Sequence, residues 1–148
     1  MMISLSEPFS ALYQICYNMR IDKEAAVIMY DAIFYRDNRG NEPTAEYINE
    51  LRQKSYTDKN ARINFNKIVA YIDILCEKGT KVGEPVVKHI DGDIWELRPL
   101  DNRILFAYYK GRLYILLHHF TKKTNKTPPR EVEQAKRNLA DYIERNDE

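Results

Sequence analysis

The sequence predicts an α+β fold in which one strand, two helices, four antiparallel strands and a last helix follow one another. Three observations predict it. An apolar stripe at steps of four and three residues runs from Asp58 to Gly79. Four short runs rich in β-branched and aromatic residues, separated by polar or glycine-bearing breaks, fill residues 85–120. A further helical period follows the double proline at 128–129.

The first half of the predicted domain contains one strand and two helices. Residues 30–35, YDAIFY, are β-branched and aromatic, and the turn-forming stretch RDNRGNEP follows them. Residues 44–54 follow Pro43 and have apolar side chains at helical spacing. In the longer second helix, Asp58 is the expected N-cap and Gly79 the expected C-terminal stop. Its apolar stripe, which we expect to cover one face of a sheet, consists of Ala61, Phe65, Ile68, Ile72 and Leu75.

The four strands that follow are expected to form an antiparallel meander, because each break between them is a short hairpin signal. In the second of these strands the period of two turns Trp95 and Leu97 to one face and Glu96 and Arg98 to the other. The last strand is apolar at nearly every position, which favours a central place in the sheet. The four strands are predicted at residues 85–90, 93–100, 103–109 and 112–120.

A closing helix over residues 130–145 completes a single domain, which we expect to span residues 29–148. The apolar side of this helix consists of Val132, Ala135, Leu139 and Tyr142. Residues 1–28 have no strong period and form an N-terminal extension outside the domain. Residues 23–25 (Lys-Glu-Ala) can be encoded by a purine-rich ribosome-binding sequence, so we hypothesise that translation begins at Met29.

The composition is that of a globular protein, since the chain has 148 residues, of which 44% are hydrophobic. Its two cysteines, Cys16 and Cys76, occur in a chain whose first residues lack the pattern of an export signal. No apolar run approaches the ~18 residues that a membrane span needs. We therefore expect a reduced, soluble, cytoplasmic protein.

Basic residues are concentrated in one part of the chain, although the net charge is only +1. Between Arg98 and Arg130 eight basic side chains accompany one acidic side chain, Asp101, so the rest of the chain is net acidic. Such local positive charge predicts a face that binds a polyanion. The alternative is a set of solvated basic side chains with no partner.

The sequence lacks the motifs of metal and nucleotide sites. Its histidines, His89, His118 and His119, do not have zinc-ligand spacing, and no close cysteine pair accompanies them. Its five glycines fall at turns or helix ends rather than in a phosphate-binding loop, and no serine lies in a nucleophile elbow. We therefore expect no metal and no nucleotide cofactor.

Cationic and imidazole side chains are expected to meet where neighbouring strands end. Arg98 lies near the end of one strand, Arg103 begins the next and His118 lies near the end of the last, with Lys122 and Lys123 directly after it. Because the end of one hairpin strand lies near the start of the next, we expect these five side chains to converge on a concave face. Fixed cations bind phosphate oxygens and stabilise a phosphorane-like transition state, and an imidazole exchanges protons near neutral pH.

Each of these residues also has a structural interpretation. Arg98 is able to pair with Glu96 or with a carboxylate of a covering helix. The neighbours His118 and His119 point to opposite faces of their strand, so at least one of them is expected to be packed or hydrogen-bonded inside the protein. The lysines between residues 122 and 126 serve equally well to keep a loop soluble.

The stretches DGDIWELRPLDNRILFAYY and LLHHFTKKTNKTPPREVEQAKRNLADYIER resemble the RelE/ParE toxin superfamily, specifically its HigB-like, phage-derived branch of type II toxin-antitoxin systems. The resemblance extends from about Tyr30 to Arg145 and leaves residues 1–28 outside it. It implies a small RelE-like toxin that cleaves mRNA on the translating ribosome without a metal. It also implies a cognate helix-turn-helix antitoxin as partner. The implied reaction is attack of a ribose 2′-hydroxyl on the adjacent phosphate.

The resemblance carries over most directly to Arg98 in ELRP, Arg103 in NRI and Lys123 in KK, which match basic active-site positions of the superfamily. It implies that the two arginines clamp the phosphate and that Lys122 or Lys123 stabilises charge or donates a proton. His118 or His119 is the candidate base. No tyrosine follows FTKK, where some RelE relatives have a catalytic one, so the general acid and base stay unassigned. The expected RNA-binding residues are Lys88, His119, Lys126 and Arg130.

Two other functions remain open, because one fold supports several activities. A ParE-like toxin would act on DNA gyrase without cutting RNA. A phage remnant would only bind its antitoxin. The basic second half of the chain and the histidine pair favour the endoribonuclease.

Overall fold

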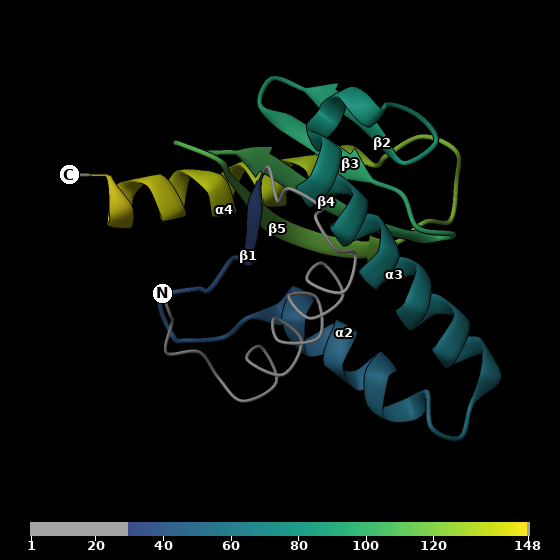
Figure 1. Cartoon of the computed structure of the whole chain (residues 1–148). Helices are drawn as coiled ribbons and strands as arrows, with labels where there is room; N and C mark the ends of the chain where they lie inside the picture. The colour runs from purple at the N-terminus through teal and green to yellow at the C-terminus, as the bar shows by residue number, and fades with distance from the viewer. Residues whose placement is uncertain (1–29, 148) are drawn as a thin grey trace.

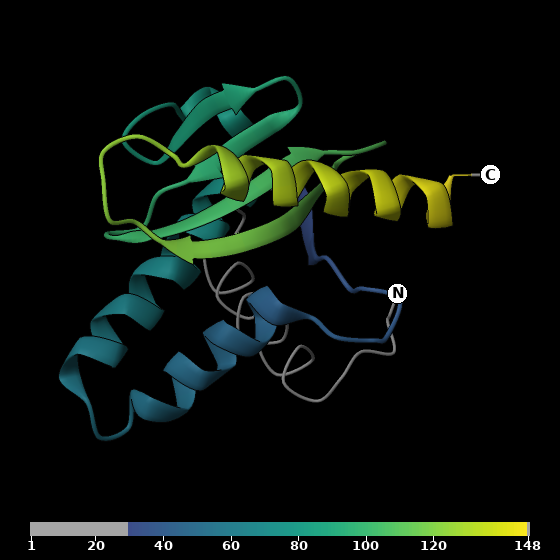
Figure 2. The same cartoon turned by 180° about the vertical axis from the view of Figure 1, so that it is seen from behind.

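The computed structural model describes residues 30–147 and has three layers, with a five-stranded sheet between two sets of helices (Figure 1). The strands are β1 (Asp31–Phe34), β2 (Val87–Asp91), β3 (Ile94–Leu97), β4 (Asn102–Tyr108) and β5 (Leu113–Thr121), in the order β1-β5-β4-β3-β2. One face is covered by α2 (Pro43–Lys54) and α3 (Lys59–Lys78), and α3 continues into the short 3-10 helix η1 (Gly79–Val82). The other face is covered by α4 (Pro129–Asn146), as Figure 2 shows from behind.

The predicted α+β class and the predicted order of elements are confirmed. The strands from β2 to β5 pair antiparallel in sequence order, and β1 pairs parallel to β5. β5 therefore has a partner on each edge and is an interior strand, as its apolar run predicted. The largest difference is at β3, which ends at Leu97 and not at residue 100. Pro99 explains it, because proline has no amide hydrogen for the ladder, and Leu100 has a left-handed φ of 60° that turns the chain.

Alternation along the strands produces two cores. Ile104 and Phe106 of β4 pack against α2 and α3, whereas Leu105 and Ala107 of the same strand pack toward Ala135 of α4. The apolar stripe predicted for the long helix lies in the first core. In α4 the stripe is only partly covered, since Leu139 and Tyr142 pack on the second core without being fully buried.

The ends of α3 are fixed by the two residues that the sequence indicated. Asp58 Oδ1 accepts hydrogen bonds from the amides of Asn60 and Ala61, at 2.8 and 3.2 Å. Gly79 ends the helix with φ 70°, and a Cβ on it would lie 2.8 Å from the ring of Tyr30. A glycine is needed there for both reasons, the backbone angle and the aromatic ring.

The proposed start at Met29 and the extension over residues 1–28 lie outside the described residues. Between residues 30 and 147 no helix combines the length and the apolar character that a bilayer crossing requires. Over the same residues, no three or more His, Cys, Asp or Glu side chains lie together as ligands for a metal ion.

Candidate phosphate-binding site

A buried carboxylate, that of Glu96, lies between two of the five side chains that were expected to converge, Arg98 and Arg103. Glu96 is in β3, on the face of the sheet that α4 covers, and its side chain is 2% exposed. The Nε atoms of Arg98 and Arg103 lie 3.3 and 3.8 Å from the same oxygen, Oε1. The pairing of β3 with β4 brings Arg98, which follows β3 directly, close to Arg103 of β4. Two guanidinium groups therefore share one negative charge.

The two arginines differ in how much of their charge reaches solvent. The side chain of Arg98 is 21% exposed and has a second, looser contact with Glu84 at 3.6 Å. The side chain of Arg103 is 7% exposed, and its Nη1 donates to the carbonyl oxygens of Leu100 and Asn102 at 2.6 and 2.9 Å. Burial lowers the pKa of Arg103, while the charge of Glu96 acts in the opposite direction. Arg98 is thus the more accessible of the two.

A pocket of about 180 Å³ opens beside this cluster. It brings together three of the predicted cations, since Arg98 shares it with Lys88 of β2 and with Lys126 of the loop that joins β5 to α4. The loop is attached to the cluster by Thr127, whose hydroxyl donates to Glu96 Oε2 at 2.7 Å. The remaining lining residues are His89, Ile90, Glu96, Asn125 and Thr127. The pocket is therefore cationic with one buried acid, a composition that suits a phosphate group.

His118 lies on the same face of the sheet and is paired with an acid of α4. Its Nε2 is 2.6 Å from Glu131 Oε1, and both side chains are half-buried. In β5 it lies opposite Leu105, two residues along β4 from Arg103. An ionised carboxylate only accepts hydrogen bonds, so in the neutral imidazole Nε2 donates to Glu131 and Nδ1 keeps its lone pair. The neutral form of His118 would therefore have a proton acceptor on the same face of the sheet as Arg103.

The remaining predicted cations lie around the end of β5. Lys122 is half-buried, and its amide donates to the carbonyl oxygen of Asp101 at 2.8 Å. Lys123 is exposed, and Arg130 is exposed at the start of α4, 3.7 Å from Glu131. Neither lysine lines the Arg98 pocket, and neither has an ion pair within residues 30–147.

His119 points away from these groups, to the face covered by α2 and α3. Its ring stacks on Tyr47 with centroids 3.7 Å apart, and its Nε2 is 3.4 Å from Asn102 Oδ1. The same oxygen accepts from Tyr47 at 2.7 Å, and Asn102 Nδ2 donates to Asn64 at 2.8 Å. Burial, reinforced by the charge of His118, lowers the pKa of His119 to about 4. A neutral histidine on this face does not fit the predicted RNA contact, and the alternation of neighbouring residues explains why.

Sequence reasoning missed part of the cluster. The sequence indicates Glu96 only as a partner of Arg98, although the period of two puts both residues on one face and the hairpin puts Arg103 next to them. Glu131 and Thr127 had no sequence signal, because their contacts depend on how α4 and its preceding loop return over the sheet. Asn125 and His89 line the pocket for the same reason, because the fold brings the loop between β5 and α4 beside β2.

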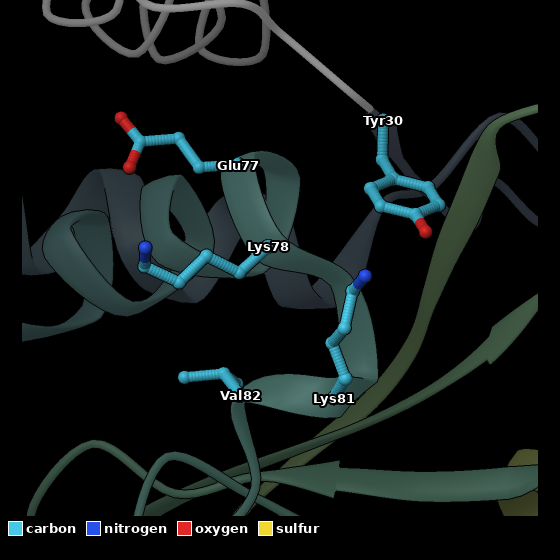
Figure 3. A pocket seen from close by; sticks show the side chains of 5 residues that line it. All are labelled: Tyr30, Glu77, Lys78, Lys81 and Val82. Atoms are coloured by element: carbon cyan, nitrogen blue, oxygen red, sulfur yellow. The ribbon is translucent and has the colours of Figure 1, made fainter.

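A second pocket contains none of the predicted site residues. It has a volume of about 310 Å³ and is lined by Tyr30, Glu77, Lys78, Lys81 and Val82, where α3 passes into η1 (Figure 3). Figure 3 shows the ammonium group of Lys81 near the ring of Tyr30, whereas Glu77 and Lys78 point elsewhere. Four of the predicted cations, Arg98, Arg103, Lys88 and Lys126, therefore lie at Glu96 or its pocket, and none of the predicted cations lines this second pocket.

Comparison with known families identifies most of the domain. Residues 46–140 match the family described as phage derived protein Gp49-like (DUF891), which covers more than half of the chain, from α2 into α4. No curated protein gave a match. The fold described above has the α+β arrangement that the RelE resemblance implied. The chain belongs to the phage-derived Gp49-like family, a family of the RelE/HigB type of toxin.

Proposed function

We propose that this protein is the toxin of a type II toxin-antitoxin system, in the HigB-like branch, and that it cuts mRNA on the translating ribosome. On this proposal it acts in the cytoplasm, needs no metal, and is silenced by a cognate helix-turn-helix antitoxin. The observation that carries the proposal is the sharing of one carboxylate, that of Glu96, by Arg98 and Arg103 beside a pocket that also contains Lys88 and Lys126.

The charges of this cluster support binding of a phosphodiester. One buried acid faces two guanidinium groups, and two ammonium groups stand at the same pocket, so positive charge is in excess. A phosphodiester has one negative charge, and its pentacoordinate transition state has more. Arg98 and Arg103 are already held by their ion pairs with Glu96, so they need little reorganisation when that charge develops, which favours the transition state over the substrate.

The proposed reaction is transesterification within the RNA. The 2′-oxygen forms a bond to phosphorus while the bond from phosphorus to the 5′-oxygen breaks. The proton of the 2′-hydroxyl passes to a base, for which Nδ1 of His118 is available because Nε2 donates to Glu131. The departing 5′-oxygen takes a proton from an acid, for which Lys122 and Lys123 are candidates. The products are a 2′,3′-cyclic phosphate and a 5′-hydroxyl.

One observation favours a second candidate, a toxin of the ParE type or a remnant that binds antitoxin without cutting RNA. Arg103 is buried and its guanidinium already donates to two backbone carbonyl oxygens. In this alternative the arginines and Glu96 stabilise the sheet and bind no phosphate. The exposed part of Arg98 and the nearby lysines favour the endoribonuclease.

The test is induced expression of the full chain followed by mapping of RNA ends. We expect growth arrest and new 5′-hydroxyl ends within translated messages, and no such ends in messages whose ribosome-binding site has been removed. The Lys123→Ala variant, expressed to the same level, is the control. Double-strand DNA breaks without RNA cuts would support the ParE-type alternative, and absence of growth arrest would support the remnant. Cuts in untranslated messages would contradict ribosome dependence.

A further inference from the structure

The turn between α2 and α3 forms a basic surface that the proposed active site does not use. We define the hairpin tip as Arg52, Lys54, Tyr56, Lys59, Arg62 and Ile63. Figure 1 shows the two helices running side by side away from the sheet, so their joined ends project from the body of the molecule. The hairpin tip is on the α2 and α3 side, whereas Glu96 and its arginines are on the α4 side.

The positive charges of the hairpin tip are not neutralised by the fold. Residues 52–63 include four basic side chains and one acid, Asp58, whose carboxylate caps α3 through the amides of Asn60 and Ala61. Within residues 30–147 the ion pairs include none of these four cations. Arg62 does donate to a backbone carbonyl oxygen, that of Ser55 at 2.9 Å, which leaves its charge uncompensated.

Two large apolar side chains are exposed among these cations. Tyr56 is 75% exposed and Ile63 is 44% exposed, and they are two of the four large hydrophobic residues that are exposed in the described part of the chain. An exposed ring beside free cations is the combination that stacks on an unpaired base while the cations bind the phosphates around it.

The stability of α3 does not explain Lys59, whereas Arg52 and Lys54 lie in the last turn of α2, where the helix dipole favours cations. The first turn of α3 contains no acidic residue, and Lys59 lies in it. The amino end of a helix has partial positive charge, so a cation there is weakly destabilising and an acid would be favoured. Lys59 therefore adds positive charge to the tip without stabilising its own helix.

We infer that the hairpin tip binds the phosphate backbone of folded RNA and that Tyr56 stacks on an unpaired base of that RNA. The charge of the tip is complementary to a phosphate backbone, and its place at the projecting end of the two helices leaves it accessible to a large folded RNA. If the proposed function holds, this RNA is ribosomal RNA. The identification of the RNA rests on the proposed function, but RNA binding by the tip does not.

The experiment measures binding without cleavage. The probe is a fluorescent RNA stem-loop with 2′-O-methyl groups throughout, which cannot undergo attack by a 2′-hydroxyl. The tip variant combines Lys54→Gln, Lys59→Gln and Arg62→Gln. The control variant removes the same charge elsewhere through Arg39→Gln, Lys81→Gln and Arg112→Gln, three exposed residues outside the tip. Fluorescence anisotropy gives the Kd at several salt concentrations for each full-length protein.

We expect the tip variant to bind about tenfold more weakly at low salt and the slope of log K against log salt to become shallower by about 2 to 3, since each phosphate contact contributes about one unit. The control variant should match the wild type. Tyr56→Ala should weaken binding several-fold and leave the slope unchanged, because stacking releases no counterion. Circular dichroism melting should show that all variants are folded.

Three results would overturn the inference. The tip variant could bind the stem-loop as the wild type does, or the two triple variants could weaken equally, which would indicate a diffuse charge effect. Alternatively, the tip variant could retain RNA binding and lose affinity for the cognate antitoxin, which would identify a protein partner. Failure of the nuclease proposal leaves this measurement intact, because the methylated RNA is never cut. Co-sedimentation of the same variants with 70S ribosomes then tests whether the RNA is ribosomal.

Discussion

Arg98 and Lys123 reach solvent, whereas Arg103 is enclosed and donates to two carbonyl oxygens. Substitution of each residue by alanine should abolish growth arrest if the cations act on a phosphate. The stability of the variants should differ. The free energy of unfolding of Lys123→Ala should differ from that of the wild type by less than about 0.5 kcal/mol. That of Arg103→Ala should be about 1–3 kcal/mol lower, because buried carbonyl oxygens are left without a donor.

Growth after induction and urea unfolding measure these two effects separately. Arg112→Ala, which removes an exposed cation from the turn between β4 and β5, is the matched control and should stay toxic. If all three active-site variants remain fully toxic, the site has been assigned to the wrong residues.

Glu96 offers a second test at the residue scale. Glu96→Gln preserves the shape of the side chain and an oxygen for Thr127, but it leaves two guanidinium groups without their shared counter-charge. Breaking a buried ion pair on one side costs about 3–5 kcal/mol. We expect a loss near the lower end of that range in urea unfolding, because Arg98 is partly solvated.

The control for Glu96 is the other carboxylate near Arg98. Glu84 is 61% exposed at 3.6 Å from that guanidinium, so Glu84→Gln should change the free energy of unfolding by less than about 1 kcal/mol. Equal effects of the two substitutions would show that Glu96 does not organise the arginines.

At the scale of elements, the predictions that succeeded depended on local pattern. The period of α3, its cap at Asp58 and its stop at Gly79 are written in neighbouring residues, and so are the short breaks between β2 and β5. The parallel pairing of β1 with β5 joins segments far apart in the chain, and no local pattern reports it. The contact of Glu131 with His118 depends in the same way on the return of α4 over the sheet.

Gly79 allows an element-scale prediction about the junction of α3 with β1. Gly79, with φ 70° and ψ −168°, lies in a region that only glycine normally occupies, and Gly92 has φ 57°, so in backbone strain alanine should cost about 1–3 kcal/mol at Gly79 and about 1–2 kcal/mol at Gly92. Only at Gly79 would the new Cβ meet an aromatic ring, that of Tyr30 at 2.8 Å. Overpacking adds about 1–3 kcal/mol, so Gly79→Ala should be the less stable variant.

Urea unfolding of the two alanine variants checks this difference. In a Tyr30→Ala background the packing part of the cost at Gly79 should disappear, because the ring is gone, and the backbone part should remain. An equal cost of Gly79→Ala with and without the Tyr30 ring would mean that the ring moves aside without cost.

At the scale of the whole molecule, some contacts of the site follow from local sequence pattern and others only from how distant segments fold together. Clustered charge and the period of two were enough to bring Arg98 and Arg103 together, and Lys88 and Lys126 line the pocket next to them. They were not enough to predict that one buried acid holds both arginines. His119, which follows His118 directly in the chain, lies on the opposite face of the sheet and stacks on Tyr47 of α2.

The contact of His119 with Tyr47 belongs to a polar network that joins α2, α3 and the sheet. Tyr47 from α2 and Asn64 from α3 meet Asn102 of β4, and His119 of β5 stacks on the tyrosine. The helical hairpin is thus joined to the sheet by a partly buried polar network in addition to the apolar core. A proton added to His119 would place an unpaired charge within this network.

The stability of the whole protein should therefore depend on pH. The folded state lowers the pKa of His119 from 6.5 to about 4, so the unfolded chain binds a proton more readily between these values. Stability is then fully present above pH 6.5 and is lost as the pH falls toward 4, by up to about 3 kcal/mol. His119→Gln cannot gain a proton, so its free energy of unfolding should change much less between pH 7 and pH 4.5. The exposed His89→Gln variant should follow the wild type, and a His119→Gln profile as steep as that of the wild type would assign the dependence to other groups.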